Sequence, residues 1–140
     1  MKKVLVFGTF DNLHKGHLDF FKQAKSFGDY LIVVVARDKN ALAAKKYLPL
    51  QNENTRLEKV AAADLVDRAI LGSPTMNYHQ TLRRQKPAVL CLGYDQKPSI
   101  KELKKNLKDH NMGGIKIIRL KPYKPGLYKS SFVRKKYDSS

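Results

Sequence analysis

The sequence predicts an α/β domain built on a doubly wound parallel sheet, and three observations support this. Strand-like and helix-like segments alternate from one end of the chain to the other. The strand-like segments are short, nearly continuous apolar runs, which are typical of strands buried on both faces. The polar segments that could carry chemistry follow the carboxyl ends of these runs, where ligands bind in such sheets.

Ten segments account for this alternation. Five are predicted as strands because they are rich in Val, Ile and Leu, and they cover residues 4–7, 30–36, 68–71, 88–92 and 115–120. Five are predicted as helices from apolar residues at helical spacing, and they cover residues 18–27, 57–65, 77–85, 100–110 and 130–137. This order predicts a single Rossmann-like domain over residues 1–140, with a five-stranded parallel sheet and helices on both faces.

Two boundaries depend on local signals. Thr55 and Glu58 fit a capping box, so we expect the third helix to begin there. Residues 37–54 are polar and mixed, with Pro49 among them, and we predict a long connection over the strand ends with room for a helical turn.

Composition limits the classes of protein that the chain can represent. The formal net charge is +16, and residues 101–140 hold 12 Lys and Arg against 3 Asp and Glu. Such charge attracts polyanions, yet a lysine-rich solvated surface explains it equally well, so nucleic acid is not the favoured partner. No apolar run approaches the ~20 residues of a membrane span. The single cysteine, Cys91, cannot form an intrachain disulfide, and we expect a reducing cytoplasm.

Residues 8–17 are the stretch that carries the most chemistry. His14 and His17 lie where the first strand hands over to the first helix, and helix N-termini attract anions. Imidazole donors can reach phosphate oxygens, and an adjacent anion favours the charged form of the ring. Gly8 and Gly16 allow the backbone to turn and approach a ligand. The alternative is one surface histidine and one packed histidine.

Other candidate residues follow later strands. Lys45, beside Lys46, either neutralises phosphates from a mobile connection or forms a solvated charge pair. Arg56 is a candidate for a phosphate or ribose contact, or an ordinary surface arginine. Gly93 permits close approach to a base, and Asp95 either accepts hydrogen bonds from ribose hydroxyls or only forms a turn.

The last segment of the chain carries two hydroxyl side chains beside a cation. Ser130 and Ser131 either cap the final helix or hold the β- and γ-phosphates of a nucleotide at its N-terminus. Lys129 beside them favours phosphate and is a second candidate phosphate contact.

These motifs together resemble a known family. Gly-Thr-Phe-Asp followed by His-x-Gly-His is similar to the signature of the cytidylyltransferase-like nucleotidyltransferases. The order Val-Ala-Arg-Asp, Leu-Gly-Tyr-Asp-Gln and Lys-Ser-Ser-Phe resembles the archaeal-type FAD synthetases, and nearly the whole chain takes part. The resemblance implies transfer of AMP from ATP to the phosphate of FMN, with release of pyrophosphate and use of a divalent metal.

The resemblance also implies roles for particular residues. Thr9, Phe10, His14 and His17 match the segment around the α-phosphate, and Lys45 matches the lysine that reaches the phosphates. Asp95 matches the acidic residue near the sugar, and Ser130 and Ser131 match the hydroxyl pair that opens the last helix. The chain lacks the Arg-Thr-x-Gly-Ile-Ser-Thr run of the glycerol-3-phosphate cytidylyltransferases, which favours ATP and FMN over CTP and a polyol or sugar phosphate.

The leading hypothesis is therefore an enzyme that transfers a nucleotidyl group by in-line attack at the α-phosphate. His14, His17 and Lys45 are expected to steady the developing charge. The motif offers no dense cage of carboxylates, so Mg²⁺ or another divalent cation is expected to arrive largely with the triphosphate. A nucleotide-binding or nucleic-acid-binding module on the same fold is the non-enzyme alternative. Relatives often pair, so a homodimer is expected.

Overall fold

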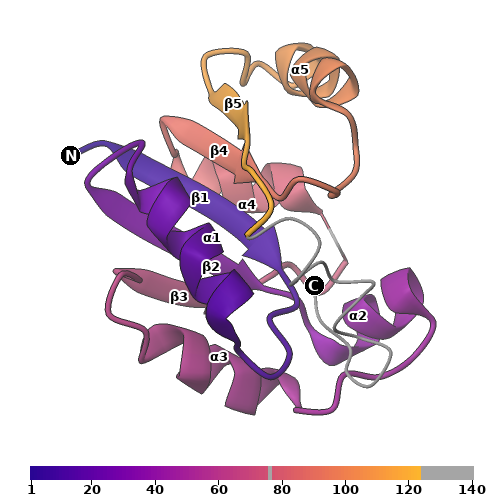
Figure 1. Ribbon diagram of the computed structural model, residues 1–140. Helices are drawn as coiled ribbons and strands as arrows, with labels where there is room; N and C mark the ends of the chain where they lie inside the picture. Colours follow the sequence, from indigo (N-terminus) through magenta and orange to yellow (C-terminus); the bar gives the residue numbers. More distant parts are fainter. Residues whose placement is uncertain (76, 124–140) are drawn as a thin grey trace.

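The computed structural model describes residues 1–75 and 77–123, so the helix predicted over residues 130–137 lies outside the described residues. Five parallel strands form one sheet in the order β3-β2-β1-β4-β5 (Figure 1). The strands are β1 (Lys3–Gly8), β2 (Tyr30–Val35), β3 (Arg68–Leu71), β4 (Val89–Leu92) and β5 (Lys116–Arg119). All five strand predictions are confirmed, with ends that differ by one residue or so.

Helices cover both faces of the sheet, as the sequence predicts (Figure 1). On one face, α1 (Lys15–Lys25) and α3 (Glu53–Ala61) bury Phe21 and Val60 against β1 and β2. On the other face, α4 (Tyr78–Gln85) and α5 (Ile100–Asp109) bury Leu82 and Leu103. None of the helices in the described ranges is long and apolar enough to cross a membrane.

The region after β2 differs from its prediction. Residues 37–54 contain a complete helix, α2 (Asp38–Lys45), where a connection with a helical turn was expected. The capping box predicted at Thr55 is wrong, because α3 begins at Glu53 and Asn52 Oδ1 caps it by accepting from the Thr55 N–H at 2.8 Å. Asn52 is as good a cap as Thr55, and the sequence alone does not separate the two.

The strand order reverses between β1 and β4, and the site lies at that point. The ladder between β1 and β2 runs to the pair Gly8 and Val35, whereas the ladder between β1 and β4 stops at Val6 and Cys91. The carboxyl ends of β1 and β4 are therefore not paired with each other, and such a switch point is where open α/β sheets bind ligands.

Candidate active site

The two histidines of the first motif form the N-terminus of α1. The helix begins at Lys15, earlier than predicted, so His14 is its N-cap and His17 lies in its first turn. His14 Nδ1 accepts from the Gly16 N–H at 3.0 Å, and His17 Nδ1 accepts from the His14 N–H at 3.3 Å. The two imidazoles thus make the reciprocal hydrogen bonds that Ser and Glu make in an ordinary capping box. Their rings stack with centroids 3.8 Å apart.

These hydrogen bonds determine where each imidazole carries its proton. Because both Nδ1 atoms accept from backbone N–H groups, the neutral rings hold their protons on Nε2. Burial lowers the pKa of His14, and burial lowers the pKa of His17 to about 3, with the charges of His14 and Lys45 acting in the same direction. Without an anion, both rings are therefore neutral near pH 7 and present Nε2–H donors.

His14 Nε2 is the donor that most needs a ligand. It is buried, and it has no hydrogen-bond partner within the part of the chain that the structure describes. A buried donor without a partner carries a desolvation penalty of about 1–3 kcal/mol. A ligand oxygen placed at this nitrogen would remove that penalty, so the geometry favours an acceptor there.

The ring of Phe10 packs against the ring of His17. Its backbone has φ 55°, the left-handed region that a bulky side chain rarely adopts. Its ring is 2% exposed and meets the His17 ring edge-on at 5.5 Å. A Cβ on Gly8 would lie 2.6 Å from Cζ of Phe10, so only glycine fits between this ring and β1. The strained backbone at Phe10 thus places a buried ring directly against His17.

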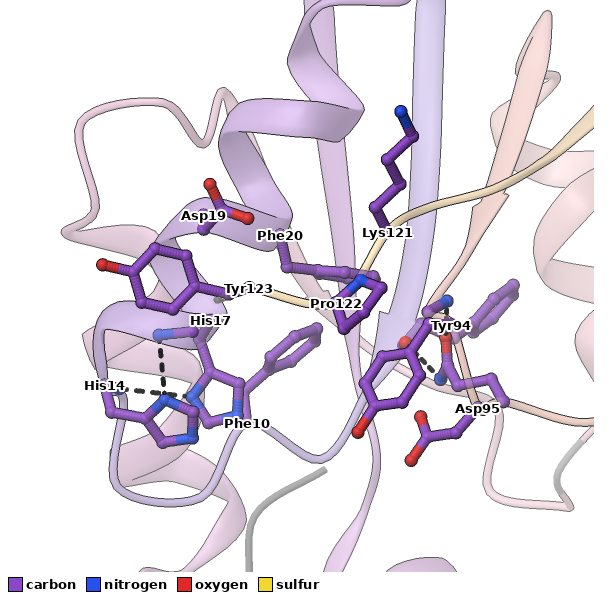
Figure 2. A pocket seen from close by; sticks show the side chains of 14 residues that line it. Phe10, His14, His17, Asp19, Phe20, Tyr94, Asp95, Lys121, Pro122 and Tyr123 are labelled. Atoms are coloured by element: carbon purple, nitrogen blue, oxygen red, sulfur yellow. Dashed lines mark hydrogen bonds between the residues drawn. The ribbon is translucent and has the colours of Figure 1, made fainter. Parts of the chain in front are cut away.

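Two adjoining cavities open at the carboxyl edge of the sheet. The first, which we call the histidine cavity, has a volume of about 70 Å³, and Figure 2 shows His14 and His17 on one side of it with Tyr94 and Asp95 on the other. The second, which we call the wide cavity, has a volume of about 570 Å³, within the range of about 300–1,000 Å³ for ligand pockets. Three residues line both cavities: Phe7, Asp95 and Gln96.

The wide cavity lies on the side of the sheet that α4 and α5 cover. Its lining is largely apolar, with contributions from Val34, Ala41, Tyr78, Leu90, Leu92 and Leu103. Gly8 and Thr9 reach it from the first motif, and Lys45 reaches it from the end of α2. Because the Lys45 ammonium also lowers the pKa of His17, its charge acts on both cavities.

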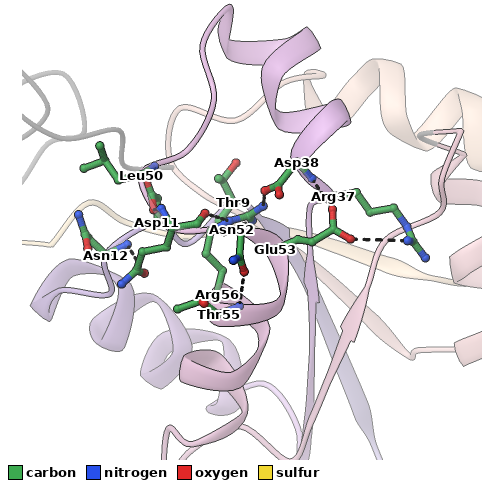
Figure 3. A network of polar contacts seen from close by, with 11 residues as sticks. Thr9, Asp11, Asn12, Arg37, Asp38, Leu50, Asn52, Glu53, Thr55 and Arg56 are labelled. Carbon is green, nitrogen blue, oxygen red and sulfur yellow. Dashed lines mark hydrogen bonds and ion pairs between the residues drawn. The ribbon is translucent and has the colours of Figure 1, made fainter.

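Arg56 occupies a structural position, which corrects the expectation of a phosphate or ribose contact. Its side chain is 0% exposed and binds the Thr9 carbonyl through Nη1 at 2.8 Å and Asp38 Oδ1 through Nη2 at 2.7 Å (Figure 3). Asp11 makes a further connection, because its carboxylate accepts hydrogen bonds from the N–H groups of Leu50 and Gln51. These contacts hold the first motif against α2 and α3. Because the Arg56 guanidinium is buried, it is not accessible to a ligand.

The segment after β4 is held by one arginine and one glutamine. Arg119 Nη1 donates to the carbonyls of Gly93, at 2.9 Å, and Gln96. The side chain of Gln96 accepts from the Gly93 N–H and donates to the Phe7 carbonyl. Asp95, between these anchored residues, is thereby directed toward both cavities.

The described residues contain no group of three or more His, Cys, Asp or Glu placed to hold a metal ion. Two carboxylates, those of Asp19 and Asp95, line the histidine cavity. Carboxylate oxygens in this number suit Mg²⁺, which keeps several waters and binds through one or two carboxylates plus substrate phosphates. The residues present therefore fit a cation that is shared with a bound triphosphate.

The structure brings together most of the residues singled out from the sequence. Nine of them line one or both cavities: Gly8, Thr9, Phe10, His14, Gly16, His17, Lys45, Gly93 and Asp95. Arg56 does not belong to the site, and Lys129, Ser130 and Ser131 lie outside the described residues. Sequence reasoning gave no role to Gln96 or Arg119. Gln96 could have been found, because it is the last residue of the Leu-Gly-Tyr-Asp-Gln motif that holds Asp95.

A strand-to-helix turn with paired imidazoles, at the switch point of a parallel sheet, defines a site suited to binding a phosphate group. The chain belongs to the cytidylyltransferase-like family of nucleotidyltransferases, because the family described as Cytidylyltransferase-like matches residues 5–136.

Similar proteins include relatives named FAD synthase. An "FAD synthase" of Thermoplasma volcanium is 41% identical over 136 residues, which are 97% of this chain and 94% of the relative. An "FAD synthase" of Aciduliprofundum boonei is 39% identical over 123 residues, covering 88% and 80% of the two chains. Both share most of their length with this protein.

Solved structures agree on the fold. A crystal structure titled "lipopolysaccharide core biosynthesis protein", from Thermoplasma volcanium, has 39% identity and a TM-score of 0.83, covering 88% of this chain and 98% of its own. A pantoate-beta-alanine ligase from Francisella tularensis has 20% identity and a TM-score of 0.65, covering 96% and 65%, and it supports the fold alone.

Proposed function

We propose that this protein transfers AMP from ATP to the phosphate of FMN, giving FAD and pyrophosphate. The observation that carries the proposal is the buried His14 Nε2, a donor without a partner in the described structure, at the N-terminus of a helix. The choice of ATP and FMN draws on the relatives named FAD synthase.

The nucleotide is proposed to place its phosphates at the histidine cavity. His14 and His17 offer Nε2–H donors there, and the N-terminus of α1 adds a partial positive charge. Neutral donors in a buried site need no reorganisation when negative charge builds up on the oxygens of the transferred phosphoryl group. Asp95 is proposed to accept from the ribose hydroxyls, and Gly93 to let the base approach the backbone. Ser130 and Ser131 are proposed to hold the outer phosphates, with Lys129 as a further contact.

FMN is proposed to occupy the wide cavity. A flat aromatic ring system suits an apolar lining of this size, and Tyr78 offers a face for stacking. The phosphate of FMN would then lie near Lys45, which lines the wide cavity and whose charge reaches His17 in the histidine cavity. In this arrangement Lys45 neutralises the acceptor phosphate while that phosphate approaches the α-phosphorus. Thr9 lines the same cavity.

The chemical step is an in-line displacement. An oxygen of the FMN phosphate forms a bond to the α-phosphorus of ATP, and the bond from that phosphorus to the bridging oxygen breaks, so pyrophosphate leaves with the electron pair. The chain needs no general base, because the attacking phosphate is already anionic near neutral pH. A divalent cation such as Mg²⁺, carried largely by the phosphates and with Asp19 as the candidate protein ligand, would supply charge neutralisation of the leaving group.

Two variants test this proposal. The wild-type protein is incubated with ATP or CTP and a panel of phosphorylated acceptors, and we expect FAD and pyrophosphate only with ATP and FMN. We expect His14→Asn, which keeps an acceptor for the Gly16 N–H but lacks the Nε2–H donor, to reduce kcat at least 100-fold, by analogy with the loss of about 10²–10³ for one oxyanion donor. His110→Asn is the matched control, since His110 lines neither cavity. Product with CTP alone, or full turnover by His14→Asn, would contradict the proposal.

Three broader properties also remain proposals. We propose that residues 1–140 act as one domain, that the protein works in the cytoplasm, and that it pairs as a homodimer. The size of the purified protein in solution, measured by light scattering, tests the last of these, and a monomer at micromolar concentration would overturn it.

A further inference from the structure

Gln96 continues the sheet where the backbone ladder ends. The last paired residues of β1 and β4 are Val6 and Cys91. Just beyond them, Gln96 Nε2 donates to the Phe7 carbonyl at 3.0 Å, and Gln96 Oε1 accepts from the Gly93 N–H at 2.7 Å. The side-chain amide thus takes the place of a peptide group between the two strands and joins their ends at the switch point.

The backbone of Gln96 is also fixed, from a different strand. Arg119, at the end of β5, donates to the carbonyls of both Gly93 and Gln96. The main chain of the segment is therefore tied to β5, and its side chain is tied to β1. A glutamine held at both ends has few conformations left, so the separation of Phe7 from Gly93 is set by the length of one amide group.

This amide lies on the wall between the two cavities. Gln96, Phe7 and Asp95 are the residues that line both the histidine cavity and the wide cavity. The two groups that Gln96 joins lie at the starts of two segments of the site: Phe7 precedes Gly8 and Thr9, and Gly93 precedes Asp95. Any change in the gap between these strand ends therefore moves one cavity relative to the other.

We propose that Gln96 is a positioning residue that holds the two cavities in register, so that the acceptor phosphate meets the α-phosphorus in line. The inference rests on the function proposed above. Reacting atoms must approach to about 3–3.5 Å, and a misplacement of about 1 Å can lower the rate by about 10²-fold. Because Gln96 acts through the strand ends, its loss affects turnover far more than the binding of either substrate.

The test compares three variants below their melting temperatures. Gln96→Met keeps the volume and removes both hydrogen bonds, and Gln85→Met is the matched control, a buried glutamine of α4 that lines neither cavity. We expect Gln96→Met to lower kcat for FAD formation by about 10- to 100-fold, with the dissociation constants of ATP and FMN, each measured alone, changed less than about threefold. Gln85→Met should leave kcat unchanged.

Gln96→Glu supplies a pH signature. A carboxylate accepts from Gly93 but cannot donate to the Phe7 carbonyl, whereas a neutral carboxyl does both, as the amide does. We expect kcat of Gln96→Glu, divided by that of the wild type, to rise as the pH is lowered from 8 to 5.5. A ratio that stays flat would contradict the bridging role.

Two outcomes separate this inference from the proposed function. If the wild type forms FAD and Gln96→Met does so at the wild-type kcat, or with losses confined to substrate binding, the positioning role is wrong and the function stands. If the wild type forms no FAD, hydrogen exchange still tests the bridge. The Gly93 N–H should exchange faster in Gln96→Met than in the wild type, and equal rates would overturn the inference.

Discussion

Replacing His17 by asparagine should flatten the dependence of stability on pH. His17 is 5% exposed, and its pKa falls from the ordinary value of 6.5 to about 3, mainly because burial disfavours the charged ring. Asparagine keeps an acceptor, Oδ1, for the His14 N–H but does not titrate. The variant therefore removes the protonation equilibrium while retaining the cap of α1.

The sign follows from which state binds the proton. Between the folded pKa of about 3 and the unfolded pKa of 6.5, the unfolded chain binds a proton at His17 and the folded protein does not. Stability is therefore fully present above pH 6.5 and is lost as the pH falls toward 3. Linkage gives a loss of about 2 kcal/mol between pH 7.5 and pH 5, and about 5 kcal/mol below pH 3.

The measurement is the free energy of unfolding in urea, at pH 7.5 and pH 5.0, for the wild type and His17→Asn. We expect the wild type to lose about 2 kcal/mol more than the variant over this interval. His14, whose pKa burial also lowers, is present in both proteins, so its contribution largely cancels. Parallel losses in the two proteins would refute the argument that burial lowers the pKa of His17 in the folded protein.

Four further predictions concern two structural positions, the cysteine and the metal ion. Arg56→Met should cost about 3–5 kcal/mol in urea unfolding, because it leaves buried partners unpaired, whereas exposed Arg84→Met should stay within about 0.5 kcal/mol. Gly28→Ala should cost about 1–3 kcal/mol, since its Cβ would meet the Lys2 carbonyl oxygen at 2.5 Å, while kcat at 25 °C stays unchanged. Burial raises the pKa of Cys91 to about 12, so a thiol reagent at pH 8 should label it only after unfolding, and labelling of the native protein would contradict its burial. A chelator should abolish pyrophosphate release without changing the melting temperature, and a drop in melting temperature would indicate a structural metal.

The strands and the histidine motif were predictable because their signals are local. Continuous runs such as residues 30–35 admit few structures besides a buried strand, and the motif occupies ten contiguous positions. What the sequence could not give is which polar side chains the fold buries. Arg56 looks like a surface residue in any window of sequence, and only the Thr9 carbonyl and Asp38, brought to it by the fold, make it an interior one.

The same reasoning explains the missed helix and the missed bridge. Helix α2 has a weak amphipathic pattern, and much of its support is tertiary, through the contacts of Asp38 with Arg56 and Glu53. Gln96 was visible beside Asp95, yet its partner is the carbonyl of Phe7, 89 residues away. Long-range pairings of side chain to backbone leave no periodic trace in the sequence.

The pairing of β1 with β4 has a consequence for folding kinetics. It joins parts of the chain that are remote in sequence, with Val4 opposite Val89. Because closing so long a loop costs chain entropy, this pairing is expected to form slowly. The helices and the more local β1–β2 pairing can form before β1 pairs with β4. During refolding from denaturant, far-UV circular dichroism should therefore recover ahead of the capacity to turn over substrate.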